Sequence, residues 1–298
     1  MDTSLEIPGL ARLVTGSSGL PRYEITTPLA QAHIYLHGAH VARFVPAGQL
    51  PLLWVSTKSC FEPGKPIRGG VPVIFPWFGP RRGDPDAPAH GFARTRSWTL
   101  ESVVQEPGGA VVVTLRLEPD AATRALWGEP HDWVLRHRIT IATALTMELE
   151  IENRGSAPFR CEEALHTYFH VSDVRQIAVH GLEAAEYYDN ADGMGRKRQA
   201  GEPIRFTAET VRTHVHTPAA CAIDDPGLNR RILVEKEHSR STIVWNPWIA
   251  KAQAMPDFGD DEWLRMVCVE TGNVADNALE IAPGARHVTR TVLRTAPR

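Results

Sequence analysis

The sequence predicts an all-β fold: a large antiparallel β-sandwich with few short helices. Short segments rich in β-branched residues alternate apolar with polar positions, and turn residues separate them at close intervals, which is typical of consecutive antiparallel strands. Long stretches with helical periodicity are scarce. No internal repeat or low-complexity linker divides the chain, and all-β units of about 200–250 residues commonly form one domain. We therefore expect residues 1–298 to form a single β-sandwich domain.

The strands expected in this sandwich include three pairs of segments with the pattern of β-hairpins, in which two alternating runs flank a short turn. The paired segments are 98–105 with 110–117, 133–141 with 145–153, and 278–282 with 287–293. Further strands are expected at residues 31–36, 50–55, 159–171, 177–181, 231–236, 241–245 and 264–270. One or two helical turns are expected at residues 121–126 and 259–263.

The overall charge and hydropathy argue against several classes of partner. The formal net charge is -3 at pH 7, so no global field favours nucleic acid or an anionic membrane, and local arginines must hold any bound anion. No apolar run approaches the ~18 residues of a membrane span, and the first residues lack the apolar core of a signal peptide. We expect a cytoplasmic monomer with no nucleic-acid partner and no membrane partner.

The sequence contains no recognisable metal or cofactor motif. The four cysteines are far apart and form no CxxC pair, so we expect reduced thiols. His214 and His216 form an HxH pair, but no acidic residue and third histidine follow at a spacing suited to a metal site. GxGxxG, P-loop and GxSxG motifs are also missing. We therefore expect neither a metal nor a cofactor.

Two neighbouring motifs place charged side chains on loops of fixed shape. IRGGVPVIFPWFGP occupies residues 67–80, and AHGFAR occupies residues 89–94. Proline sets φ and glycine permits turns that other residues avoid, and loops fixed on a scaffold often carry binding or catalytic groups. Because a guanidinium fork matches phosphate oxygens, Arg68 and Arg94 are candidate anion ligands, and His90 lies in the same segment.

Two later segments carry groups suited to proton transfer. In the expected strand 159–171, alternation puts His166 on a face with polar and aromatic neighbours. That face resembles the floor of a cleft, although a half-exposed sheet with incidental histidines would give the same pattern. Glu270 ends the apolar strand 264–270, where partial desolvation can raise the pKa of a carboxyl group and make it a general base. A carboxylate that faces water at a strand end is the alternative.

The motif VWNPW, at residues 244–248, carries two tryptophans around an Asn-Pro turn. Tryptophan faces bind the apolar face of a sugar ring, and asparagine can bond to hydroxyl groups. Trp245 is therefore a candidate sugar-binding residue. An aromatic residue that closes the core is the equal alternative.

Taken together, these segments resemble those of the aldose 1-epimerase superfamily, and most of all its hexose-6-phosphate mutarotase branch. The motifs that carry the resemblance lie in order between residues 67 and 274: IRGGVPVIFPWFGP, AHGFAR, EALHTYFHVSDV, VWNPW and DEWLRMVCVETGNV. The resemblance implies a galactose mutarotase-like supersandwich, in agreement with the strand pattern. It also implies the interconversion of the α and β anomers of glucose 6-phosphate and related aldohexose 6-phosphates by general acid/base ring opening, with a small-molecule phosphosugar as partner.

The resemblance further implies roles for individual residues. His166 matches the general acid and Glu270 the general base. The positions matched to the family's substrate-binding residues are Arg68, His90, Arg94 and Asp189. The two arginines are implied to hold the phosphate. Asn190 stands after the aspartate where the family pattern has a basic residue.

Two other functions remain as alternatives. One is an aldose 1-epimerase that acts on free hexoses, which would need the acid/base pair and no phosphate site. The other is a non-catalytic carbohydrate-binding protein, because the same fold recurs in carbohydrate-recognition domains. A protein that only binds sugar has no need for both a general acid and a general base, and this favours the enzyme.

Overall fold

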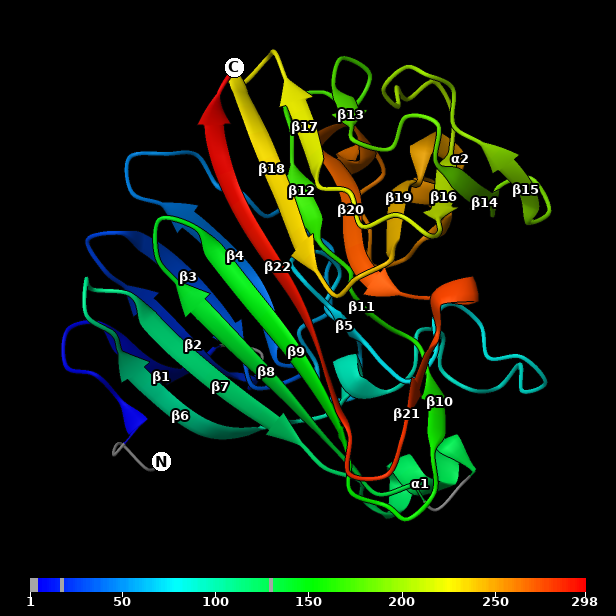
Figure 1. The fold of residues 1–298 in the computed structure, drawn as a ribbon. Coiled ribbons are helices and arrows are strands. Elements are labelled where there is room, and N and C mark those ends of the chain that lie inside the picture. The colour runs from blue at the N-terminus through cyan, green and yellow to red at the C-terminus, as the bar shows by residue number, and fades with distance from the viewer. Residues whose placement is uncertain (1–4, 17–18, 129–130) are drawn as a thin grey trace.

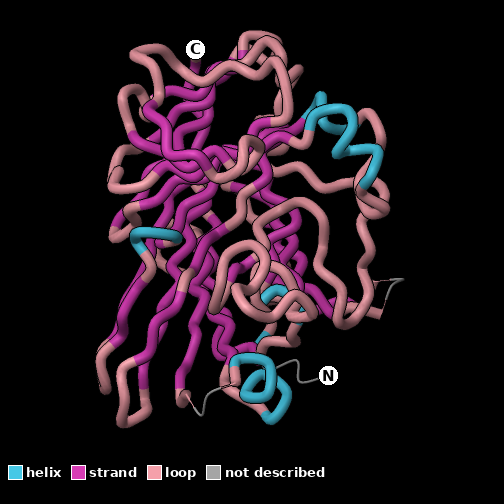
Figure 2. The backbone as a smooth tube through the Cα atoms, turned by 90° about the vertical axis from the view of Figure 1, so that its right-hand side faces the viewer, coloured by secondary structure: helices cyan, strands magenta, loops and turns pink. Residues whose placement is uncertain are grey.

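The computed structural model describes residues 5–16, 19–128 and 131–298, and it confirms the predicted all-β fold (Figure 1). Strands dominate the backbone, whereas the helices are few and short (Figure 2). Among the described residues, the paired strands of every sheet run antiparallel. None of the described helices has the length and apolar character needed to span a lipid bilayer.

Two large sheets form most of the structure, and we call them the long sheet and the site sheet. In spatial order the long sheet contains β13 (Ala178–His180), β17 (Cys221–Asp225), β18 (Arg230–Glu237), β22 (Arg286–Pro297), β9 (Leu145–Asn153), β8 (Trp133–Ile141), β7 (Val111–Leu117) and β6 (Thr99–Gln105). The site sheet contains β15 (Gly195–Arg198), β14 (Glu186–Asp189), β16 (Thr210–His214), β19 (Ser241–Asn246), β20 (Met266–Asn273), β11 (Glu163–Leu165) and β5 (Val73–Ile74). A further strand, β12 (Tyr168–His170), also pairs with β20.

Smaller elements complete the fold. A four-stranded sheet contains β1 (Ala11–Thr15), β2 (Pro21–Thr26), β3 (Ala30–Tyr35) and β4 (His40–Pro46). A separate pair contains β10 (Phe159–Cys161) and β21 (Leu279–Ile281). The helical segments are α1 (Ala121–Trp127), α2 (Trp248–Ala254) and the 3-10 turns η2 (Ala93–Thr95), η3 (Glu262–Arg265) and η4 (Ala275–Asn277).

One face of the long sheet is the platform on which the other sheets pack. Thr291, Met147 and Ile139 lie side by side on β22, β9 and β8, and all three are fully buried. On this face the hydroxyl oxygen of Thr271 on β20 lies 3.3 Å from that of Thr291. Further along, Nδ1 of His137 on β8 lies 3.1 Å from a carbonyl oxygen of the β3–β4 turn. The site sheet and the β1–β4 sheet therefore pack on different parts of one buried face.

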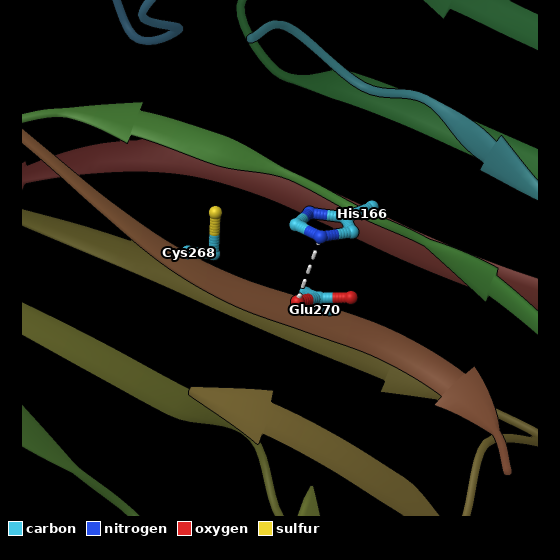
Figure 3. Close-up of side chains that lie close together, drawn as sticks. All are labelled: His166, Cys268 and Glu270. Atoms are coloured by element: carbon cyan, nitrogen blue, oxygen red, sulfur yellow. Dashed lines mark ion pairs between the residues drawn. The ribbon is translucent and has the colours of Figure 1, made fainter. Parts of the chain in front are cut away.

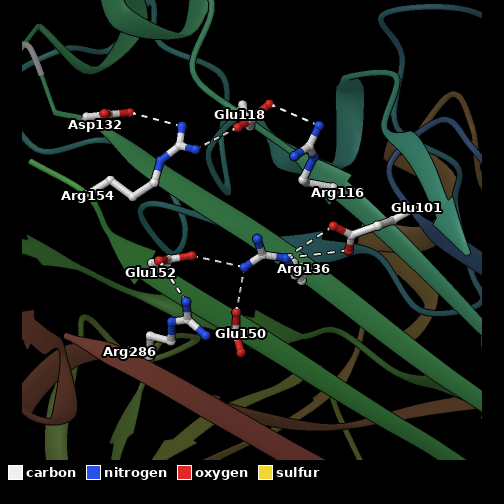
Figure 4. A network of polar contacts seen from close by, with 9 residues as sticks. All are labelled: Glu101, Arg116, Glu118, Asp132, Arg136, Glu150, Glu152, Arg154 and Arg286. Atoms are coloured by element: carbon white, nitrogen blue, oxygen red, sulfur yellow. Dashed lines mark hydrogen bonds and ion pairs between the residues drawn. The ribbon is translucent and has the colours of Figure 1, made fainter. Parts of the chain in front are cut away.

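The opposite face of the long sheet is covered by ion pairs (Figure 4). Arg136 on β8 contacts Glu150 and Glu152 on β9 at 2.8 and 3.0 Å, and Glu101 on β6 at 3.4 Å. Exposed pairs of this kind contribute about 0–1 kcal/mol each. The alternation of apolar and charged residues along β8 thus separates a buried face from a solvated one, as the period of two in the sequence predicts.

The sequence located many of these elements correctly. The first two expected hairpins are β6–β7 and β8–β9. The expected strands at residues 31–36, 177–181, 231–236 and 241–245 correspond to β3, β13, β18 and β19. The expected helical turns at residues 121–126 are α1, which begins where the Asp120 side chain accepts a hydrogen bond from the amide of Thr123 and ends at Gly128 in the left-handed conformation.

The third expected hairpin and the strand at residues 50–55 are wrong. β21 and β22 follow each other in the chain, but β21 pairs with β10, and β22 pairs with β9 and β18. The side chain of Asn153, at the end of β9, donates to the carbonyl of Ile281. The backbone carbonyl of Asn153 accepts from the amide of Gly284. The turn therefore closes around the end of β9. Residues 50–55 form only isolated bridges through Leu53 and Val55.

The long strand expected at residues 159–171 is also wrong, because it is divided into β10, β11 and β12. At each break an amide donates to a carbonyl that flanks β5: that of Glu162 to Pro76 at 2.9 Å, and that of His166 to Pro72 at 3.0 Å. Both bonds are in register with the pairing of β11 and β5, so residues 67–80 lie along this segment.

The remaining differences concern the segment before β20. The helical turns expected at residues 259–263 form slightly later, as η3. Helix α2 was missed, because the Asn-Pro sequence that precedes it indicates a turn; here the side-chain oxygen of Asn246 accepts from the amide of Trp248. Glu270 lies inside β20, and not at the end of a strand as predicted.

Gly91, next to His90, should be intolerant of substitution. It has a φ of +69°, and a Cβ atom built on it would lie 1.9 Å from the carbonyl oxygen of Phe75. Because that atom belongs to the backbone, Gly91→Ala is expected to lower the free energy of unfolding by about 2 kcal/mol or more. Urea unfolding would measure this, with Gly201→Ala as the control, since Gly201 has open space around it and no positive φ. Equal stability of the two variants would contradict the prediction.

Candidate active site

The pairing of β20 with two consecutive strands brings His166 and Glu270 together. β11 ends just before His166, β12 begins just after Thr167, and both strands pair with β20. The register places the gap between them beside Glu270, so that Nε2 of His166 lies 3.4 Å from Oε1 of Glu270 (Figure 3). The two side chains are only 7% and 1% exposed. An imidazole and a carboxyl group are therefore in contact in a site from which bulk water is nearly excluded.

Burial and positive charge determine the protonation of this pair. Burial raises the pKa of the Glu270 carboxyl well above its usual range, and the positive charge of Arg94 only partly opposes this. Burial also lowers the pKa of His166 well below its usual range, and the charges of Arg94 and Arg68 lower it further. Both shifts favour neutral groups. The pair thus carries one proton between its two groups. Either group can act as the proton donor to a substrate, while the other acts as the proton acceptor.

Aromatic rings surround the imidazole of His166. The ring of Tyr168 stacks on it, with centroids 4.8 Å apart and an angle of 13°. Trp245 and His90 present their rings nearly perpendicular to it, at 5.9 and 5.6 Å. Nδ1 of His166 and Oε2 of Glu270 are buried without a hydrogen-bond partner among the described residues. The site therefore holds its reactive groups by packing and leaves polar atoms free.

His90 joins the two rigid loops at the site. Its φ is +66°, a conformation that side chains rarely adopt. Its Nδ1 faces the amide of Gly79, which donates to it at 3.3 Å, and its ring packs edge-on against Phe78 at 4.7 Å. Burial and then the charges of Arg94, His166 and Arg68 lower the pKa of His90 well below its usual range. A neutral imidazole that accepts at Nδ1 carries its proton on Nε2 and can donate from there.

Arg68 is held by protein groups on both sides of its guanidinium. Its Nε and Nη2 both lie 3.1 Å from Oδ2 of Asp257, and its Nη1 donates to the hydroxyl of Tyr168, also at 3.1 Å. Burial by itself would lower the pKa of Arg68, but Tyr168 and Asp257 raise it above its usual range. The side chain is therefore a fixed cation whose charge is matched by a carboxylate.

Arg94 differs from Arg68 because no carboxylate contacts it within the part of the chain that the structure describes. Its Nη2 donates to the carbonyl of Ala89 at 2.8 Å, and its Nε is buried with no partner. Burial and the neighbouring charge of Arg68 lower the pKa of Arg94 to about 10. It remains charged at neutral pH and retains donors that an anion could accept from.

Cys268 adds a third potential metal donor beside the acid–base pair. Donor atoms of His166, Cys268 and Glu270 lie within 4.8 Å of one another. Burial and the proximity of Glu270 raise the pKa of the Cys268 thiol well above its usual range, whereas the thiolate is the form that binds metals. The positive charges of Arg68 and Arg94 also oppose a further cation. These surroundings favour a protonated thiol, and the absence of a metal stays a prediction.

The structure thus brings together six of the seven residues predicted for the site, and it places Asp189 elsewhere. Asp189 ends β14, and its carboxylate contacts Lys197 on β15 at 2.9 Å. β14 is separated from β20 by β16 and β19, which corresponds to about 14 Å at the usual strand spacing. The role of Asp189 stays a prediction without a contact to support it.

Sequence reasoning missed Asp257 and gave no separate role to Tyr168. Tyr168 lies in the HTY motif next to His166, so its proximity could have been inferred. Asp257 follows α2, and its neighbour Phe258 packs against Trp54 and Trp245 at 4.9 and 6.5 Å. No local pattern pairs Asp257 with Arg68, which lies 189 positions earlier in the chain.

The sandwich fold agrees with the comparisons with known proteins. The model of the aldose 1-epimerase family matches residues 21–294, so the chain belongs to this family. Two relatives, from Cenchrus ciliaris and Escherichia coli K12, carry the name "Putative glucose-6-phosphate 1-epimerase", and each is 34% identical to the chain. The first match covers 96% of this chain and 88% of the relative, and the second covers 89% and 87%.

Solved structures show the same relationship. A crystal structure from Salmonella typhimurium, described as a "putative mutarotase", has a TM-score of 0.90 and 30% identity, over 98% of this chain and 96% of that chain. A galactose 1-epimerase from Lactobacillus acidophilus has a TM-score of 0.72 at 11% identity, over 96% and 98% of the two chains, and therefore shows the fold alone. The resemblance seen in the sequence and the galactose mutarotase-like fold are confirmed.

The positive charges around His166 give a prediction for its titration. The imidazole should stay neutral down to well below pH 6.5, because burial and then Arg94 and Arg68 disfavour its protonated form. Arg94→Gln removes one of these charges, so the pKa of His166 should rise toward its ordinary value. NMR titration of the His166 ring protons measures both values. Arg12→Gln is the control, since that side chain is 71% exposed on β1, and identical titrations in the two variants would contradict the assignment.

Proposed function

We propose that the chain is a hexose-6-phosphate 1-epimerase, which interconverts the α and β anomers of glucose 6-phosphate and related aldohexose 6-phosphates. The observation that carries the proposal is the buried contact between His166 and Glu270 at 3.4 Å, beside Arg94, which no carboxylate contacts among the described residues. The pair supplies the proton chemistry, and Arg94 supplies the charge for a phosphate. The names of the relatives from Cenchrus ciliaris and Escherichia coli agree with this substrate.

The reaction needs one proton removed from the O1 hydroxyl and one delivered to the ring oxygen. Both oxygens are bonded to C1 of the sugar, so two side chains in contact with each other can reach them from one site. In the ion-pair form of the pair, Glu270 takes the proton from O1 while His166 delivers one to the ring oxygen. The C1–O5 bond breaks, the aldehyde forms, and the pair is left as a neutral acid and a neutral imidazole.

The protonation state that follows ring opening is the one that the site favours. Burial raises the pKa of Glu270 and lowers that of His166, so the buried pair is stabilised when neutral. Rotation about C1–C2 then presents the other face of the aldehyde. Closure of the ring returns the proton from Glu270 to O1 and the proton of the ring hydroxyl to His166. No net proton or electron is consumed in this sequence of steps.

The other residues of the site supply the walls and the anchor. Trp245 and His90 flank His166, and an indole face is suited to the apolar side of a sugar ring. His90 can donate from Nε2 to a hydroxyl group. Arg94, with a buried Nε that has no partner among the described residues, is suited to a phosphate oxygen. Arg68, which donates to the hydroxyl of Tyr168, contributes a second charge that is partly matched by Asp257.

Loss of either proton-transfer group should remove most of the catalysis. Glu270→Gln and His166→Ala are each expected to lower kcat by roughly 10²–10⁴-fold, the usual contribution of a general acid or base. Polarimetry of freshly dissolved α-glucose 6-phosphate measures the acceleration over the spontaneous reaction. Absence of acceleration by the wild type would falsify the proposal. If calorimetry then still showed sugar binding, the chain would be a carbohydrate-binding protein.

The role of Arg94 separates phosphosugars from free hexoses. Arg94→Ala should raise KM for glucose 6-phosphate by roughly tenfold or more, because a charge-assisted hydrogen bond is lost, while the efficiency toward free glucose falls much less. The ratio of kcat/KM for the two sugars is the measured quantity. An unchanged ratio in both Arg94→Ala and Arg68→Ala would instead support an aldose 1-epimerase of free hexoses.

A further inference from the structure

The carboxylate of Asp257 lies against one of the two arginines of the site. Nε and Nη2 of Arg68 each lie 3.1 Å from the same oxygen, Oδ2 of Asp257. The two side chains are 19% and 17% exposed, so solvent screens the pair far less than a surface salt bridge. Asp257 therefore cancels much of the positive charge that Arg68 brings to the site.

A common anchor fixes the two partners of this ion pair. The amide of Ser56 donates to the carbonyl of Arg68 at 3.0 Å, and its hydroxyl oxygen accepts from the amide of Gly259, two residues after Asp257, at 3.2 Å. Between these two residues, Phe258 is fully buried. The carboxylate is thus held in place by its own segment and does not depend on Arg68 to position it.

No carboxylate contacts Arg94 in the part of the chain that the structure describes, and its hydrogen bond to Ala89 is to a carbonyl group. The charge of Asp257 also acts on Arg94, but without a contact between them. The other titratable groups at the site are shifted toward their neutral forms; they are His90, His166, Tyr168, Cys268 and Glu270. Among the described residues, Arg68 is therefore paired with a carboxylate, and Arg94 is not. A phosphate that binds there meets about one net positive charge, with a carboxylate close by.

We propose that Asp257 determines how strongly the site prefers a phosphosugar to a free sugar, by neutralising Arg68 and leaving Arg94 as the principal cation for the phosphate. This inference rests on the proposed function. It divides the two arginines into different roles: Arg94 supplies the charge, and Arg68 positions Tyr168 and bonds to the ligand with little net charge.

Asp257→Asn tests the proposal, because an amide keeps an oxygen that can accept from Arg68 and removes only the charge. Isothermal titration with inorganic phosphate, in a phosphate-free buffer of low ionic strength, should show roughly fivefold to tenfold tighter binding than in the wild type. The gain should shrink at high salt. The ratio of kcat/KM for glucose 6-phosphate over glucose should rise by a similar factor.

Asp260→Asn is the matched control, because Asp260 lies on the same segment, is 58% exposed and pairs with Lys58. It should leave phosphate affinity unchanged. Asp257→Ala provides a second variant, which removes both the charge and the acceptor. Tighter phosphate binding in both Asp257 variants supports the role in specificity. Unchanged or weaker binding in Asp257→Asn overturns it and leaves Asp257 as a residue that only holds Arg68 in place.

Failure of the proposed function would give a different result. In that case the wild type accelerates the anomerisation of neither sugar. The phosphate titration does not depend on turnover, so it still decides whether Asp257 weakens anion binding at this site. Thermal unfolding of each variant excludes the possibility that a change in affinity reflects loss of the fold.

Discussion

The candidate site depends on the pairing of β20 with both β11 and β12 and on the two-residue gap between them. On the other edge of this segment, the amides of His166 and Tyr168 donate to Pro72 and Gly70, in register with the pairing of β11 and β5. Towards β20 the register is the same on both sides of the gap, since Leu165 lies opposite Thr271 and Tyr168 opposite Cys268. His166 therefore lies opposite Glu270, and this register creates the buried contact between them.

Burial then gives the contact its chemical character. A carboxyl group and an imidazole that both avoid charge favour the state in which Glu270 holds the proton, and the nearby arginines help to keep the imidazole neutral. The same arginines would attract a phosphate. Charge compensation by Asp257 connects these two effects, since a fully uncompensated pair of arginines would bind an anion more tightly and lower the pKa of His166 further.

Much of the fold could be predicted from the sequence because its signals are local. The hairpins β6–β7 and β8–β9 join strands across short turns, and α1 carries its own capping residues. Two of the failures come from distant segments. β21 pairs with β10 and not with its neighbour β22, and the segment 159–171 is divided among pairings with β21, β5 and β20. A pattern of alternating residues carries no information on such competitors.

For the site, the sequence by itself determined the chemical inventory: an imidazole, a carboxylate, two arginines and a tryptophan on motifs that resemble one family. Tertiary structure decided which of them meet. It placed six of the seven expected residues together and left Asp189 on β14. It also moved Glu270 from an expected strand end into the buried centre of β20. Above all, it paired Arg68 with Asp257, because the charge of a site depends on distances between side chains, which only the folded chain fixes.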